Sequence, residues 1–498
     1  ILCHLDTQLS SGLITAISPS KLVLVWSSCG SNEDEAANEE DVKNASASFN
    51  PSVSDDLNDE DIEKAKGDAI GDTLYSERFV LSTLLKLTKI EKDLNEDEEF
   101  EKDLCSLWDM TIEKDVVKLL LKHKVLELFA GIIKNTEDKR LTEILVGIVG
   151  NMCSLSETRD ELCVNAEVTG PLIDLISCTD TLTLVQLMRL FHAALVFENS
   201  GDEMMWFQHF KNAESFVEDF GTILMNSMNP TLLVNAFEAL NAICAKFAVI
   251  EIQADEKDLC FCDVFVQPHL VRGVIEAFRT LLPDSTEKDS SDDTSTPTQN
   301  SQKIMSLFLD IHVILSQYEK VSKKCYESIL PDLMKCISQI LSPLCQPICL
   351  LPLTFNEQGV IENLNELFHA LGDPFDEICF AQMITIWNLI GTDREMKVQN
   401  SQKWDEEDET DEEVNAEDIC MTILEFLTRT VKLSEEQQLK NSLRLHTPRT
   451  VMKLLSALSA GDSEQDIKDS CNKIKTAFDA LDTEEAPSIN DSDVAVHS

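Results

Sequence analysis

The sequence has little of what a β-rich fold needs. Only 15 glycines and 14 prolines occur in 498 residues, and aromatic residues make up 6%. A β-sandwich needs turn residues at about every tenth position to connect its short strands. Apolar residues nevertheless make up 43%, which is enough to bury a large core. The composition therefore favours stacked helices and excludes a chain that is disordered throughout.

Basic residues are also scarce. Lys and Arg number 41 against 90 Asp and Glu, which gives a formal net charge of −49. Such a charge repels nucleic-acid phosphates and anionic membranes, so we expect neither nucleic acid nor a membrane as a partner. No run reaches about 18 uncharged apolar residues, so no membrane-spanning helix is predicted. The charge favours basic protein partners, or else serves only to keep a large apolar solenoid in solution.

Patterns of catalysis and metal binding are missing as well. The 16 cysteines are scattered, which favours a reducing compartment over a disulfide framework. Two close pairs, Cys260 with Cys262 and Cys345 with Cys349, lack the second pair or the nearby histidines that a zinc site needs. No HExxH, GxSxG or GxGxxG motif occurs in the sequence. We therefore predict a protein that is not an enzyme and that holds no metal or cofactor.

What the chain does have is a repeated helical pattern. Apolar segments that resemble one another begin at Val125 (VLELFAGIIKN), Gly170 (GPLIDLISCTD) and Phe216 (FVEDFGTILMN), and a fourth begins at His269. Their spacing of about 45 residues is that of HEAT and armadillo units. Between them lies a second series: ILVGIVGNMC, TLVQLMRLFHAAL and LLVNAFEALNAIC. A helix pair cannot bury its apolar face alone, so the pattern predicts an all-α, armadillo/HEAT-like α-solenoid.

Changes in composition divide the chain into seven parts. Polar, acidic stretches with few large apolar residues predict disorder, and amphipathic stretches predict helices. In order, the predicted parts are a disordered acidic N-terminal region (1–66), armadillo-like repeats (67–282), a disordered insertion (283–303), helical repeats (304–398), an acidic linker (399–418), C-terminal helices (419–482) and a disordered tail (483–498).

Three motifs in the first repeats point to a family. They are GDAIGDTLYSERFVLSTLLKL (67–87), LCSLWDMTIEKDVVKLLL (104–121) and RLTEILVGIVGNMCSLSETRDELC (140–163). In this order they resemble the serum amyloid A-like protein family, over residues 67 to about 180. The resemblance implies an armadillo-type helical fold, a nuclear or nucleocytoplasmic location, and a positive role in cell proliferation without catalytic activity.

Two residues stand out as candidate protein-binding residues. Trp108 could anchor a protein interface, because aromatic side chains dominate such contacts. Alternatively it closes the N-terminal end of the solenoid, with Asp109 or Thr111 capping a helix that starts near Ile112. Asn151 ends a small-residue helix, where an amide can both donate to and accept from the backbone of an extended ligand. Alternatively, Asn151 satisfies a neighbouring loop.

The sequence therefore predicts a non-enzymatic, armadillo-type scaffold for protein interactions. An acidic protein that acts as a chaperone, or that regulates nucleotide exchange on one, is the alternative prediction. The sequence identifies neither the partner nor the oligomeric state.

Overall fold

We describe the fold from a computed structural model. It describes residues 68–90, 94, 97–197, 204–251, 261–283, 298–401, 415–460 and 465–484. These residues form 23 α-helices and one 3₁₀-helix, and they contain no strand, only an isolated bridge between Ala69 and Ser76. The predicted all-α solenoid is confirmed. The predicted disordered region 1–66 lies outside the described residues.

Most helices belong to three rows within one compact unit, which the described residues of 70–73 and 78–484 form. The first row comprises α5 (Lys114–Lys122), α8 (Ser156–Val164), α11 (Met204–Asn212), α14 (Phe261–Phe265) and α17 (Glu319–Glu327). The second comprises α6 (Val125–Asn135), α9 (Ala166–Asp174), α12 (Phe216–Asn226), α15 (Pro268–Leu281), α18 (Leu330–Leu344) and α21 (Glu377–Ser401). The third comprises α4 (Glu98–Met110), α7 (Lys139–Met152), α10 (Thr181–Leu195), α13 (Pro230–Glu251), α16 (Gln299–Ser316), α20 (Phe355–Ala370), α22 (Ala416–Leu433) and α25 (Gln465–Glu484).

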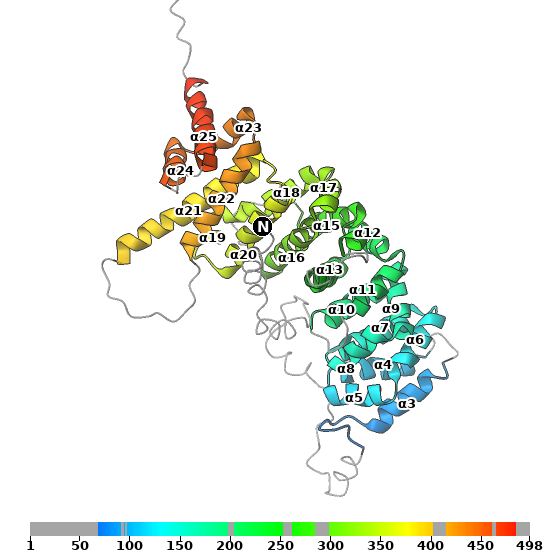
Figure 1. The fold of residues 1–498 in the computed structure, drawn as a ribbon. Helices are drawn as coiled ribbons and strands as arrows, with labels where there is room; N and C mark the ends of the chain where they lie inside the picture. The colour runs from blue at the N-terminus through cyan, green and yellow to red at the C-terminus, as the bar shows by residue number, and fades with distance from the viewer. Residues whose placement is uncertain are drawn as a thin grey trace, which may run out of the picture. The chain divides into compact units, whose positions relative to one another are not determined.

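The remaining helices are α3 (Glu77–Leu87), η2 (Leu175–Ser177), α19 (Pro347–Leu350), α23 (Glu436–Leu443) and α24 (Pro448–Ala460). Each helix of the third row packs against the next one, from α4 through to α25 (Figure 1). The second row does the same, with η2 between α9 and α12. The two apolar series seen in the sequence are thus the second and third helices of successive three-helix repeats.

The helices of the third row begin with a common device. From α4 to α22, the residue before each helix of this row carries a short polar side chain that accepts a hydrogen bond from an N–H group of the first turn, which stabilises the helix start. These caps are Asp97, Asp138, Asp180, Asn229, Thr298, Thr354 and Asn415. Because the caps recur, residues at the same distance from them occupy equivalent places in successive repeats.

Four predicted boundaries differ from the structure. Helix α16 begins at Gln299, so the predicted insertion 283–303 extends too far. The first turn of α16 is polar in sequence but helical, because Thr298 caps it. Helix α21 runs to Ser401 and α22 begins at Ala416 after Asn415, so the predicted linker 399–418 is too long at both ends. Helix α25 continues to Glu484, past the predicted start of the tail at 483. Residues 284–297, 402–414 and 485–498 lie outside the described residues.

The largest side chains of the core gather between α10 and α14. Phe191, Trp206, Phe210, Phe216 and Phe265 are all at most 1% exposed. The rings of Phe210 and Phe216 have centroids 4.6 Å apart, and those of Phe191 and Phe210 are 5.6 Å apart at 85°. Edge-to-face pairs of this kind add to the stability gained by burying apolar area. No helix among the described residues is both long and apolar enough to cross a membrane.

Candidate functional site

Trp108 lies in the last turn of α4, with its indole ring against Gly147 of α7. A Cβ at position 147 would overlap the ring, so only glycine leaves room for it. Trp108 is half-buried there. The indole therefore fills the junction between the first two helices of the third row.

Asn151 lies one turn further along α7, at the same junction. Its Nδ2 donates hydrogen bonds to the Trp108 carbonyl oxygen at 3.3 Å and to Thr111 Oγ1 at 3.1 Å. Thr111 is the residue that ends α4, and its own hydroxyl donates to the Trp108 carbonyl. Both amide hydrogens thus tie α7 to the end of α4. These contacts match the alternative in which Asn151 satisfies a neighbouring loop, and a role of Asn151 in binding a partner stays a prediction.

The predicted cap of the following helix is wrong. Helix α5 begins at Lys114, not near Ile112, and Glu113 precedes it without a side-chain hydrogen bond to the first turn. Thr111 instead closes the end of α4. The error arises because Thr next to a helical pattern marks a helix end as well as a helix start.

Further along the third row, polar side chains occupy one equivalent place. His192 lies twelve residues after the cap Asp180, Asn241 twelve after Asn229, Asp310 twelve after Thr298 and Glu366 twelve after Thr354. We call these four residues the polar line. His192, Asn241 and Asp310 are half-buried, and Glu366 is exposed. At the equivalent place α7 carries Gly150, which packs on Leu190 of α10.

Contacts between neighbouring helices bring charged side chains next to members of the polar line. Lys303 of α16 forms an ion pair with Glu238 of α13. Burial lowers the pKa of His192 on α10, and the Glu238 carboxylate opposes this shift. Three consecutive helices of the row therefore share one group of charged and titratable side chains.

The next step along the row is a hydrogen bond between α16 and α20. Asn363 Nδ2 donates to Asp310 Oδ1 at 2.7 Å. Burial raises the pKa of Asp310 to about 6, although the hydrogen bond from Asn363 acts in the opposite direction. Asn241 Oδ1 on α13 is buried and has no hydrogen-bond partner among the described residues. In the middle of the row, helix stacking thus gives Asp310 a partner and leaves the Asn241 side-chain oxygen without one among the described residues.

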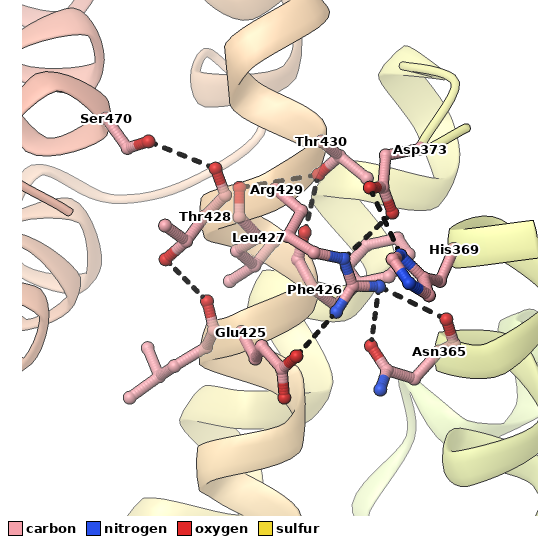
Figure 2. A network of polar contacts seen from close by, with 11 residues as sticks. Asn365, His369, Asp373, Glu425, Phe426, Leu427, Thr428, Arg429, Thr430 and Ser470 are labelled. Carbon is pink, nitrogen blue, oxygen red and sulfur yellow. Dashed lines mark hydrogen bonds and ion pairs between the residues drawn. The ribbon is translucent and has the colours of Figure 1, made fainter. Parts of the chain in front are cut away.

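Between α20 and α22 a half-buried arginine network adds to the packing of the Phe368 ring on the Phe426 ring. Figure 2 shows Arg429 of α22 reaching toward Asn365 and Asp373. Its Nε donates to Asp373 Oδ1 at 2.9 Å, and its Nη2 donates to the carbonyl and the side-chain oxygen of Asn365 at 3.2 and 3.0 Å. Nη1 donates to Glu425 at 2.9 Å, and the side chain is only 16% exposed. Each donor nitrogen of Arg429 thus has an acceptor. Because the acceptors on Asn365 belong to α20, the network holds α22 against α20.

Sequence reasoning missed both the polar line and the arginine network. Their members are far apart in the sequence, and each alone reads as an ordinary polar residue on a helix. The signal that could have found the polar line is the recurring Asp, Asn or Thr cap with a polar residue twelve positions later. No comparable signal marks the partners of Arg429.

Two further features of the described residues bear on catalysis and metal binding. A depression at the start of α7 and α10 is lined by Asp138, Arg140, Glu143 and Asp180, among others. Arg140 pairs there with Glu143 at 2.8 Å and with Glu101 at 2.7 Å, so its charge is already balanced. Within the part of the chain that the structure describes, no three His, Cys, Asp or Glu side chains come together in a way that could hold a metal ion.

The chain is similar in sequence to known proteins over part of its length. It is 28% identical over 245 residues to Protein saal1 of Danio rerio, which covers 45% of this chain and 49% of that protein. It is 31% identical over 190 residues to Protein saal1 of Xenopus tropicalis, covering 36% and 41%, and 28% identical over 192 residues to Protein SAAL1 of Homo sapiens, covering 36% and 40%. The matched region thus spans half or less of these curated relatives. No family model matches the chain.

Among solved structures the likeness is distant. A designed armadillo repeat protein in complex with the peptide (KR)4 matches 58% of this chain and 98% of its own, at 13% identity and a TM-score of 0.38. The crystal structure of an engineered protein matches 57% of this chain and 95% of its own, at 14% identity and a TM-score of 0.38. At such low TM-scores nothing about function follows from the likeness.

Proposed function

We propose that this chain is a non-enzymatic scaffold whose third row of helices binds an extended segment of a partner protein. The observation that carries the proposal is the polar line, which repeats at one place in α10, α13, α16 and α20. Stacking buries the apolar faces of these helices, so the regularly spaced polar side chains are the ones that remain to recognise a partner. An extended peptide presents its own polar groups at regular intervals and suits such a row.

The chemistry of the row favours a basic partner. Asp310 and Glu366 supply carboxylates at its middle, and the net charge of −49 attracts cations from a distance. Attraction of this kind raises the association rate and falls as salt is added. Because the chain resembles the serum amyloid A-like family, we further propose that it acts in the nucleus and promotes cell proliferation.

The test selects peptides from a displayed library of random extended sequences against the full chain. Two variants with the same change of net charge then separate a local site from a general charge effect. Glu366→Lys alters the third row, whereas Asp174→Lys alters an exposed position at the end of α9 in the second row. We expect Glu366→Lys to weaken binding of the selected peptides about tenfold and Asp174→Lys by less than about twofold.

Equal weakening by the two variants would show that only the overall negative charge attracts the peptides. No effect of Glu366→Lys, together with a strong effect of Asp174→Lys, would place the binding face on the second row. Either result contradicts the proposal.

A further inference from the structure

Four Ser-Pro or Thr-Pro dipeptides occur in the sequence: Ser18-Pro19, Thr296-Pro297, Ser342-Pro343 and Thr447-Pro448. The structure describes the last two, and it places them in opposite settings. Ser342 and Pro343 lie inside helix α18, near its end. Thr447 lies in the short connection between α23, which ends at Leu443, and α24, which begins at Pro448.

The chain around Thr447 is open to solvent. Thr447, Pro448 and Arg449 are exposed, and Leu445 is 69% exposed, although large apolar side chains are mostly buried in this protein. Thr447 Oγ1 accepts a hydrogen bond from the Thr450 N–H at 3.3 Å and lies 3.0 Å from Thr450 Oγ1. A macromolecule that approaches this connection can therefore reach the Thr447 hydroxyl without opening the core.

The charge around Thr447 is unusual for this chain. No Asp or Glu occurs between Glu436 and Asp462, whereas Lys440, Arg444, Arg449 and Lys453 lie within that stretch. In a chain with a net charge of −49, this is a stretch in which a dianion meets cationic side chains and no acidic ones among its neighbours in the sequence.

We propose that Thr447 is a phosphorylation site for a proline-directed Ser/Thr protein kinase. In the reaction the γ-phosphorus of ATP forms a bond to Thr447 Oγ1 and breaks its bond to the oxygen that bridges to the β-phosphorus. ADP leaves, and the hydroxyl proton passes to the base of the kinase. Pro448 supplies the proline that this class of kinase reads immediately after its target.

The phosphate then strengthens the corner between α23 and α24. It brings about 1.5 to 2 negative charges and three acceptor oxygens to the start of a helix. The Thr450 N–H, which already points at Thr447 Oγ1, becomes a donor to a charged acceptor. Arg444 and Arg449 flank the phosphate in sequence with charges of the opposite sign.

The experiment incubates the folded full chain with ATP and a purified proline-directed kinase and maps the phosphate by mass spectrometry. We expect Thr447 to be modified at least about tenfold faster than Ser342, because a helix must open before a kinase can extend its backbone. Thr447→Ala removes this modification, and Pro448→Ala removes it while the hydroxyl remains. Synthetic peptides of 337–349 and 442–453 serve as unfolded references, in which both sites are expected to react.

Ser342 reacting as fast as Thr447 in the folded chain overturns the proposal. So does a Thr447 that stays unmodified in the folded chain while its peptide reacts. A second measurement compares amide hydrogen exchange in α24 with and without the phosphate. Slowing by about threefold is expected from a charge placed at a helix start, and faster exchange would contradict the stabilising role.

Discussion

Two regions of one stack are held together by different chemistry. Between α10 and α14 the helices meet through aromatic rings, with Phe210 and Phe216 only 4.6 Å apart. Between α20 and α25 an aromatic pair, Phe368 with Phe426, is accompanied by hydrogen bonds. Arg429 joins α22 to α20, Ser442 Oγ donates to the Glu377 carbonyl at 2.9 Å, and Ser470 Oγ donates to the Thr428 carbonyl at 3.0 Å. The third row of helices runs through both regions, yet the contacts that join its helices differ.

The difference shows that helices can stack in the same row whether aromatic rings join one helix to the next or hydrogen bonds do so as well. Apolar contacts are non-directional, so an aromatic junction loses stability in proportion to the volume removed. A buried polar network is directional, so it fails when one partner is removed and leaves the others unpaired. The two regions should therefore respond differently to matched substitutions.

The largest effect is expected from Phe216→Ala in the aromatic region. Phe216 is fully buried against Phe191, Phe210 and Phe265, so its removal leaves a cavity that costs about 3–5 kcal/mol. Urea unfolding followed by circular dichroism measures the loss. Phe216→Leu, which refills most of the space, should cost roughly 1.5 kcal/mol or less. Equal losses for the two variants would mean that ring contacts, and not volume, stabilise this region.

Arg429→Ala comes next, in the polar region. It leaves the half-buried Asp373 carboxylate and the Asn365 oxygens without the Arg429 donor, which we expect to cost about 2–3 kcal/mol. Arg429→Lys keeps the charge but cannot reach all of these acceptors, so urea unfolding should place it between wild type and Arg429→Ala. If Arg429→Lys is as stable as wild type, charge alone holds α20 to α22 and the directional account is wrong.

Gly147→Ala probes a junction that combines both kinds of contact. A Cβ there displaces the Trp108 ring, and we expect a loss of about 2 kcal/mol. Gly131→Ala on α6 is the matched control: nothing lies within 4 Å of its Cβ, so the change should be neutral or stabilise the helix. A double-mutant cycle with Trp108→Ala should show coupling of about 1 kcal/mol, and additive losses would rule out the direct clash.

The smallest effect concerns Asp310, which lies on α16 between the two regions. Its pKa in the folded chain is about 6, above its ordinary value of 3.8, so the folded state binds more protons than the unfolded state between these pH values. The ionised carboxylate therefore destabilises the fold at neutral pH, and this penalty disappears as the pH falls toward about 4. Asp310→Asn should stabilise the chain by about 1–2 kcal/mol at pH 7.5 and by almost nothing near pH 4.

Asp332 supplies a control of opposite sign. Hydrogen bonding to Arg279 lowers its pKa, so its ionised form stabilises the fold above its unfolded pKa, and this stabilisation is lost as the pH falls. Asp332→Asn should therefore weaken the fold at neutral pH, by a small amount because the pair faces solvent. Urea unfolding at several pH values compares the two variants. The same sign for both would contradict the assignment of burial as the cause at Asp310.

The rows of helices could be predicted because their cause is local. The apolar spacing that marks Val125, Gly170 and Phe216 follows from the need to bury one face of each helix, and this need repeats with every unit. Boundaries were less predictable where helices run through polar sequence. Gln299 begins a helix although its neighbours in the sequence resemble the predicted insertion, because one hydrogen bond, from the Ser301 N–H to Thr298 Oγ1, suffices to start the first turn.

The candidate site was only partly predictable for a related reason. Trp108 and Asn151 each stand out in the sequence, but that Asn151 donates to the carbonyl of Trp108 depends on how α4 meets α7. The ion pairs of Glu238 with Lys303 and of Asp373 with Arg429 form only because the fold brings residues that are distant in the sequence together. Side chains that contact each other between repeats have no fixed separation in the sequence, so a single sequence does not reveal such pairs.

The most direct test of the proposed role is hydrogen exchange of the full chain with and without a peptide selected by binding. We predict slower exchange in α10, α13, α16 and α20, since these helices carry the polar line, and unchanged exchange in α5, α8 and α11 of the first row. Protection confined to the first or second row, or no protection at saturating peptide, would contradict the account.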